Sequence, residues 1–262
     1  MSAPPAYLLV AHGSRDPRPQ IGLEQLARRL QARLAAPEGA SHLPVSDGVS
    51  TAVATASASS TALVRTASLE LAPLQLHQRI VQVAQEANSA GASQLQIVPL
   101  FLLPGVHLKQ DIPAEVARAQ QTLAGRMPLR LRSHLGSRSS MQHLLARRFE
   151  RHAAPARVLL AHGSRRTGGN QPVEAMAARL GAVAAYWSVA PTLDERLASL
   201  AQQGNEQIAI MPYFLFPGGI ADAIAERVAQ LRSAQPQLSL QLDEPLGATD
   251  ELADAICEGL HA

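Results

Sequence analysis

The chain of 262 residues contains a single cysteine, Cys257, and a single lysine, Lys109. One cysteine excludes an intrachain disulfide, and it excludes any zinc or iron–sulfur site that needs several thiolates from one chain. Aromatic residues make up only 3% of the chain and the formal net charge is +2. Nucleic-acid binding is therefore not expected, because it draws on dense basic patches and stacking aromatic side chains.

Long apolar runs are also missing. No segment approaches the roughly 20 apolar residues of a membrane helix, and the apolar run at residues 7–11 is too short for a signal peptide. We therefore expect a cytoplasmic protein that does not bind a membrane. The arginine pairs Arg28-Arg29 and Arg147-Arg148 lie on helical patterns, where we expect them on solvated helix faces.

The sequence repeats itself once. Three segments of the first half return in the same order in the second half: 8–15 as 158–165, 98–105 as 211–218, and 135–136 as 246–247. Three matches in order indicate the duplication of a whole domain. We predict domains at residues 1–152 and 153–262, with a Ser/Thr/Ala-rich, flexible insertion at residues 44–66 that has no counterpart in the second half.

Each half alternates apolar strands with amphipathic helices. The predicted strands cover residues 6–11, 67–72, 95–100 and 129–133, then 157–161, 184–190, 207–212 and 238–242. The predicted helices cover residues 19–35, 74–90, 112–124 and 139–151, then 171–181, 192–203, 221–233 and 249–260. This alternation is typical of an α/β protein, with two parallel sheets that carry helices on both faces.

Candidate functional residues follow three of the strands. His12 comes directly after the first strand, Glu70 lies near the end of the second, and His107 lies in the loop that leaves the third. If the first strand sits between the other two, as in a flavodoxin-like order, these side chains converge at one edge of the sheet. Two imidazoles and a carboxylate suit a divalent metal such as iron or cobalt, and they can also move protons.

Other readings of single residues compete with this one. A glutamate in a strand often faces solvent or an ion pair, so Glu70 is as well explained by structure as by function. We expect the remaining isolated histidines to be structural or on the surface: His42, His77, His134, His143, His152 and His261.

The segments 11–16, 98–102 and 104–112 together resemble the sirohydrochlorin chelatases, in their long, two-repeat form. Only residues 44–66 lie outside this resemblance. It implies a chelatase-like fold of two duplicated flavodoxin-like lobes across a cleft, which inserts Fe²⁺ or Co²⁺ into a tetrapyrrole without an organic cofactor. It also implies that His12 and His107 handle the metal and that Glu70 is the acidic catalytic residue.

The same resemblance implies substrate contacts within the two motifs, at Ser14, Arg15, Leu102, Gly105 and Lys109. The second half departs from the pattern: it keeps His162, but Ser188 aligns with Glu70, and no histidine follows Pro217. We therefore expect the second lobe to complete the cleft for the macrocycle. Because the duplication supplies both lobes, we expect a monomer whose partners are the tetrapyrrole and the metal.

Two alternatives stay open. A non-catalytic carrier of metal or tetrapyrrole would use the same residues. A histidine phosphatase also has His-Gly after its first strand, but its motif places an arginine before that histidine, where this chain has Ala11.

Overall fold

The structure, a computed structural model, describes residues 3–35 and 62–261. Its strands are β1 (Ala6–Ala11), β2 (Val64–Ser68), β3 (Leu95–Pro99), β4 (Leu129–Leu131), β5 (Ala156–Ala161), β6 (Val183–Tyr186), β7 (Gln207–Pro212) and β8 (Ser239–Leu242). Its α-helices are α1 (Pro17–Ala35), α2 (Leu76–Ser89), α3 (Ile112–Leu123), α4 (Ser139–Glu150), α5 (Gln171–Arg179), α6 (Leu193–Gln202), α7 (Gly219–Ala234) and α8 (Asp250–His261). None of the helices in the described part is long and apolar enough to span a membrane.

The strands form two parallel sheets of four. Their orders are β2-β1-β3-β4 and β6-β5-β7-β8, so each half repeats the same topology. The first strand of each sheet lies between the second and the third, which confirms the predicted flavodoxin-like order. The carboxyl ends of β1, β2 and β3 therefore share one edge of the first sheet, and that edge is where the ligand site of such a sheet is expected.

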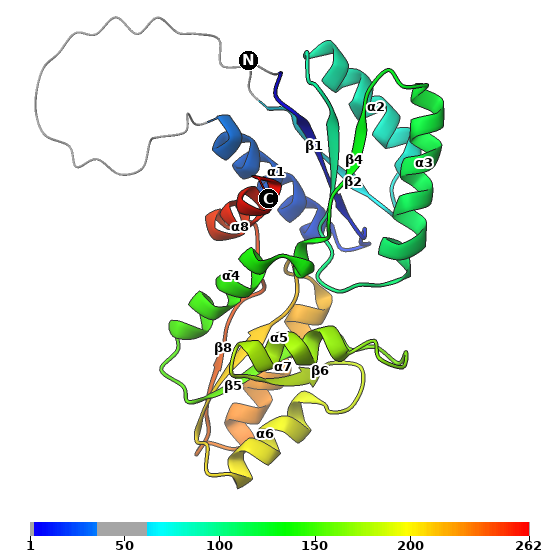
Figure 1. The fold of residues 1–262 in the computed structure, drawn as a ribbon. Coiled ribbons are helices and arrows are strands. Elements are labelled where there is room, and N and C mark those ends of the chain that lie inside the picture. The colour runs from blue at the N-terminus through cyan, green and yellow to red at the C-terminus, as the bar shows by residue number, and fades with distance from the viewer. Residues whose placement is uncertain (1–2, 36–61, 262) are drawn as a thin grey trace, which may run out of the picture.

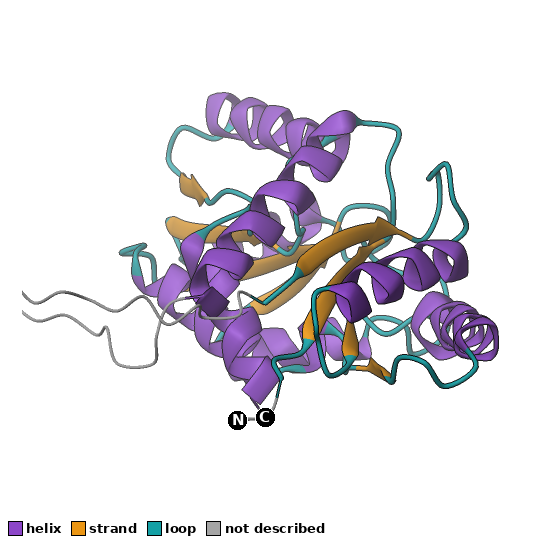
Figure 2. Ribbon diagram, turned by 90° about the horizontal axis from the view of Figure 1, so that it is seen from above, coloured by secondary structure: helices purple, strands orange, loops and turns teal. Residues whose placement is uncertain are grey.

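Helices lie on both faces of each sheet (Figures 1 and 2). Helices α2 and α3 cover the outer face of the first sheet, and α6 and α7 cover the outer face of the second. On the inner faces, α1 packs on β1 and β2, and α5 packs on β5 and β6. The apolar residues of α1, α4, α5 and α8 join the two inner faces in one continuous core. Strand β1 is buried on both faces, with Leu9 in the central core and Leu8 in the outer one, as is usual for parallel sheets.

The final helix crosses between the halves. Helix α8 follows β8 of the second sheet, yet it packs against α1 and α4 (Figure 1). Arg29 and Arg33 of α1 form ion pairs with Asp250 and Asp254 of α8. The two repeats thus share one apolar core, and the division at residues 152 and 153 stays a prediction about the sequence repeat.

The second strand lies earlier in the chain than predicted. We expected residues 67–72, but β2 covers Val64–Ser68, so it begins inside the segment 44–66 that we assigned to an insertion. The run Leu69–Ala72 imitates a strand by its alternating leucines, but Leu71 is exposed and has a φ of +55°. The chain turns there, because a left-handed residue cannot continue a strand. Residues 44–61 of the predicted insertion lie outside the described residues.

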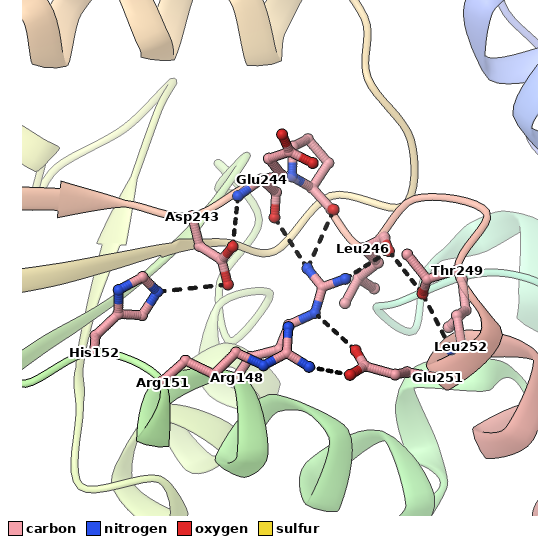
Figure 3. Close-up of polar contacts among 10 residues, drawn as sticks. Arg148, Arg151, His152, Asp243, Glu244, Leu246, Thr249, Glu251 and Leu252 are labelled. Carbon is pink, nitrogen blue, oxygen red and sulfur yellow. Dashed lines mark hydrogen bonds and ion pairs between the residues drawn. The ribbon is translucent and has the colours of Figure 1, made fainter.

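Arg148 is buried, not solvated as its helical pattern had predicted (Figure 3). Its guanidinium donates hydrogen bonds to the carbonyl oxygens of Glu244, Pro245 and Leu246, at 3.1, 3.2 and 2.8 Å. These carbonyls belong to the loop between β8 and α8. Arg148 of α4 therefore holds the loop through which the chain passes from β8 to α8.

The substitution Arg148→Met should lower the free energy of unfolding by about 3 kcal/mol, because it leaves buried carbonyls without their charged donor. Urea denaturation followed by circular dichroism measures the change. The matched control is Arg147→Met on the same helix, where the arginine is exposed and the change should stay within about 0.5 kcal/mol. Equal effects of the two substitutions would contradict this account of Arg148.

Candidate active site

Three side chains meet where β1, β2 and β3 end. The Nδ1 atom of His12 lies 3.8 Å from Oε2 of Glu70, and the Nε2 atom of His107 lies 3.9 Å from Oε1 of the same carboxylate. The imidazole rings of His12 and His107 pack edge to face, with centroids 4.8 Å apart. The structure thus brings together the three residues that the strand-end argument had selected.

This cluster has the dimensions of a metal site. One donor atom from each of His12, Glu70 and His107 lies within 4.8 Å of the others. Nitrogen and oxygen ligands about 2.1 Å from a shared ion lie roughly 3.4 to 4.2 Å apart. A small rotation of one side chain is therefore enough to bring all three onto one ion. The side chains of His12 and Glu70 are about half exposed, so metal and solvent can reach them.

Gly13 lets the first two loops touch. It has a φ of +103°, and a Cβ atom at this position would come within 2.1 Å of the carbonyl oxygen of Glu70. The N–H of Glu70 in turn donates to the carbonyl oxygen of His12, at 2.9 Å. Only glycine combines this backbone conformation with so close an approach, and the result is that Glu70 sits beside His12.

His107 lies in the first turn of a helix and not in the predicted loop. Residues His107–Asp111 form a π-helical turn that runs into α3, a distortion often found at functional sites. Its Nδ1 atom lies 2.7 Å from Oδ2 of Asp111. A carboxylate can only accept, so Nδ1 carries the proton and the Nε2 lone pair faces Glu70.

Sequence reasoning missed Asp111. Such a carboxylate orients a metal-binding imidazole and makes it a stronger donor. The only sequence signal was its position four residues after His107, which helical geometry brings to the same face. Phe101 was also missed: its ring lies 6.2 Å from that of His12 and 6.3 Å from that of His107, centroid to centroid.

The predicted substrate-contact residues differ in their exposure and in what they contact. Arg15 and Lys109 are exposed, and Ser14 lines a cavity of about 470 Å³ beside Leu71 and Leu74. Leu102 is half-buried at the junction of the lobes, where its carbonyl oxygen accepts a hydrogen bond from Tyr213. Gly105 accepts from the N–H of Lys109 and so helps to start the turn that carries His107.

The loop that carries His12 is tied to the second lobe. Arg18 binds the carboxylate of Asp16 and, through two nitrogens, that of Asp222 at the start of α7. The hydrogen bonds from Arg18 lower the pKa of Asp16 to about 2, so this exposed cluster stays fully charged at neutral pH. The cluster links the start of α7 to the first lobe at the surface.

The second lobe keeps the backbone of the site but not its chemistry. The N–H of Ser188 donates to the carbonyl oxygen of His162, as that of Glu70 does to His12. Ser188 therefore occupies the place of Glu70, as the sequence repeat predicted, and its hydroxyl group also donates to His162. Counted from Pro104 and Pro217, Ile220 takes the place of His107. Of the residues equivalent to the cluster, only His162 can bind a metal.

Known proteins share both sequence and fold with this chain. The model of the CbiX family matches it twice, at residues 6–152 and 156–262. A sirohydrochlorin ferrochelatase of Priestia megaterium is 26% identical over 62% of the chain, and the match spans 65% of that relative, just under two thirds. A protein of the same name from Bacillus subtilis is 27% identical over 65% of the chain and 70% of its own length.

Solved structures agree on the architecture. The structure of SirB from Bacillus subtilis with Fe³⁺ superposes with a TM-score of 0.73, at 21% identity over 98% of this chain and 94% of SirB. A CbiX described as the terminal enzyme of siroheme biosynthesis in denitrifying bacteria gives a TM-score of 0.61, at 22% identity over 98% of both chains. The chain therefore has the chelatase-like fold of two duplicated lobes.

The substitution Asp111→Asn should weaken Co²⁺ binding about tenfold. A neutral amide accepts the Nδ1–H of His107 less strongly than a carboxylate does, so it holds the orientation of the imidazole ring less firmly. A titration followed by the visible spectrum of Co²⁺ measures the affinity. Gln110→Ala, at an exposed neighbour in the same turn, is the matched control and should leave the affinity unchanged. Unaltered affinity in Asp111→Asn would show that this carboxylate does not orient the ligand.

Proposed function

This chain belongs to the CbiX family, and on that premise we propose that it is a sirohydrochlorin chelatase, which inserts Fe²⁺ or Co²⁺ into a tetrapyrrole. The observation that carries the proposal is the cluster of His12, Glu70 and His107 at the strand ends of a chelatase-like lobe. The curated relatives named sirohydrochlorin ferrochelatase support it. No organic cofactor takes part, because metal insertion exchanges a divalent cation for two pyrrole protons.

The cluster supplies both a metal donor set and a route for protons. Nε2 of His107 points its lone pair at the site, since Nδ1 donates to Asp111. His12 faces the same carboxylate from the other side, so the two imidazoles deliver the metal to one face of the macrocycle. As the metal bonds to the pyrrole nitrogens, these imidazoles accept the released protons and Glu70 passes them to solvent. Half-exposure of Glu70 provides that exit.

The substrate is a flat ring with many carboxylates. Arg15 and Lys109 flank the cluster and pair with acidic side chains of the ring. Ser14 adds a hydroxyl donor, while Leu102 and Gly105 shape the loop that ends in His107. His162 contacts the substrate or supports its loop, and the second lobe closes the cleft over the other face of the ring.

Both metals fit the donor set, because imidazole and carboxylate ligands accept Fe²⁺ and Co²⁺ alike. The SirB structure is known with iron, and a SirB of a Bacillus subtilis subspecies is known in complex with cobalt. We further propose a monomer, since the chain holds both lobes on one shared core.

Anaerobic incubation with sirohydrochlorin and either Fe²⁺ or Co²⁺, followed by visible spectroscopy, tests the activity. The wild-type protein should accelerate insertion over a control without protein, and the ratio of the two rates identifies the preferred metal. Binding of the macrocycle without acceleration would favour a carrier, and hydrolysis of a phosphate ester would favour a phosphatase.

The variants His12→Ala, His107→Ala and Glu70→Gln should each lower the rate at least about a hundredfold, because each removes a group that moves metal or protons. Their circular dichroism and melting temperature should match the wild type, since His12 and Glu70 are exposed and His107 is only half-buried. His143→Ala, at an exposed histidine on α4, is the matched control and should retain full activity. Substantial activity in the double variant that combines His12→Ala with His107→Ala would contradict this assignment.

A further inference from the structure

A second polar cavity lies away from the metal cluster. It has a volume of about 520 Å³ and forms where β4 ends, α4 begins and α8 ends. Arg130, Arg132 and Arg138 line it, together with several serines, whereas Glu258 is the one acidic residue in its wall. None of the residues assigned above to the active site lines this cavity. The active site therefore does not account for the arginines that line this cavity.

Arg138 is the most deeply placed of the three arginines. It is only 7% exposed, yet its Nε atom has no hydrogen-bond partner among the described residues. Its two terminal nitrogens donate to the carbonyl oxygens of Ile256 and Ser133, at 3.2 and 3.1 Å. Leaving a donor of a buried cation unpaired is costly, so Arg138 lines the cavity with one N–H group short of a full set of acceptors.

Arg132 reinforces the positive charge. One of its nitrogens donates to the carbonyl oxygens of Gly259 and Leu260, at 3.0 and 3.1 Å. These bonds close the end of α8, which is a structural role, but they occupy only part of a guanidinium that has five N–H donors. Burial and the nearby Arg132 lower the pKa of Arg138 to about 10, so Arg138 remains cationic at neutral pH.

The start of α4 opens onto the same space. This helix has 12 residues, and its N-cap position holds Arg138, whose side chain gives no cap. The N–H groups of its first turn therefore lack a side-chain acceptor, and the helix dipole makes this end positive. Ser139, the first helical residue, is exposed and lines the cavity. A helix start that shares a cavity with the guanidinium groups of Arg132 and Arg138 is a combination that binds oxyanions.

From this geometry we propose that the cavity is a binding site for a tetrahedral oxyanion, the phosphate group of a small molecule. Arg132 and Arg138 bind the oxyanion from one side and the first turn of α4 binds it from the other. The volume exceeds that of one phosphate ion, which leaves room for the organic part of the ligand. Because α8 comes from the second repeat and β4 from the first, the bound anion ties the repeats together at the end of α8. This inference does not depend on the proposed function.

Thermal unfolding of the full chain in rising concentrations of inorganic phosphate tests the proposal, with chloride at matched ionic strength as the reference. Phosphate and sulfate should raise the melting temperature with saturation, because an anion that binds only the folded state stabilises it. Acetate should not do so. A shift no larger than that of chloride, or an equal shift with acetate, would overturn the proposal.

Two variants locate the effect. Arg132→Met should raise the half-saturating phosphate concentration about tenfold or more, through loss of a charged donor. Ser139→Asp should abolish the phosphate-dependent shift by repulsion, while its carboxylate favours the start of α4, so its fold is retained. Arg126→Met, at an exposed arginine outside the cavity, is the control and should respond like the wild type. A wild-type response in Ser139→Asp would exclude this cavity as the site.

Discussion

One apolar core between the inner faces of the two sheets is the constraint on which this molecule depends. Helix α1 packs on β1 and β2 and helix α5 packs on β5 and β6, and together with α4 and α8 they join the inner faces of both sheets in one apolar core. Helix α8 makes the dependence specific, because it leaves the second sheet and packs on α1 and α4. The relative position of the lobes is thus set by apolar packing, and the cluster of Asp16, Arg18 and Asp222 only adds to it at the surface.

Buried and half-buried arginines hold loops and helix ends in this structure by donating to several backbone carbonyls, which lysine could not do in the same way. Arg148 donates to three backbone carbonyls of one loop, and Arg132 and Arg138 bind carbonyls at the end of α8. A planar guanidinium reaches several acceptors from one fixed position, whereas an ammonium group is a flexible point charge. The near absence of lysine, with Lys109 alone, fits a protein whose cations hold backbone at the joints between repeats.

The two repeats have the same backbone but divide the chemistry unequally. Both place a His-Gly turn after their first strand, and both pair that turn with the loop after the second strand. Only the first repeat adds Glu70 and His107, with Asp111 behind His107. One face with a candidate metal site and one face without further ligands suit the flat substrate of the proposed function, which would receive its metal from one side.

Much of this could be predicted from the sequence. The repeats, the alternation of strands and helices, and the convergence of His12, Glu70 and His107 all followed from periodicity and from the rule for parallel strand ends. The limits of β2, the burial of Arg148, the part played by Asp111 and the crossing of α8 were decided only by the tertiary structure. The reason is physical: periodicity reports which face of an element is apolar, whereas these features depend on which distant segment covers that face.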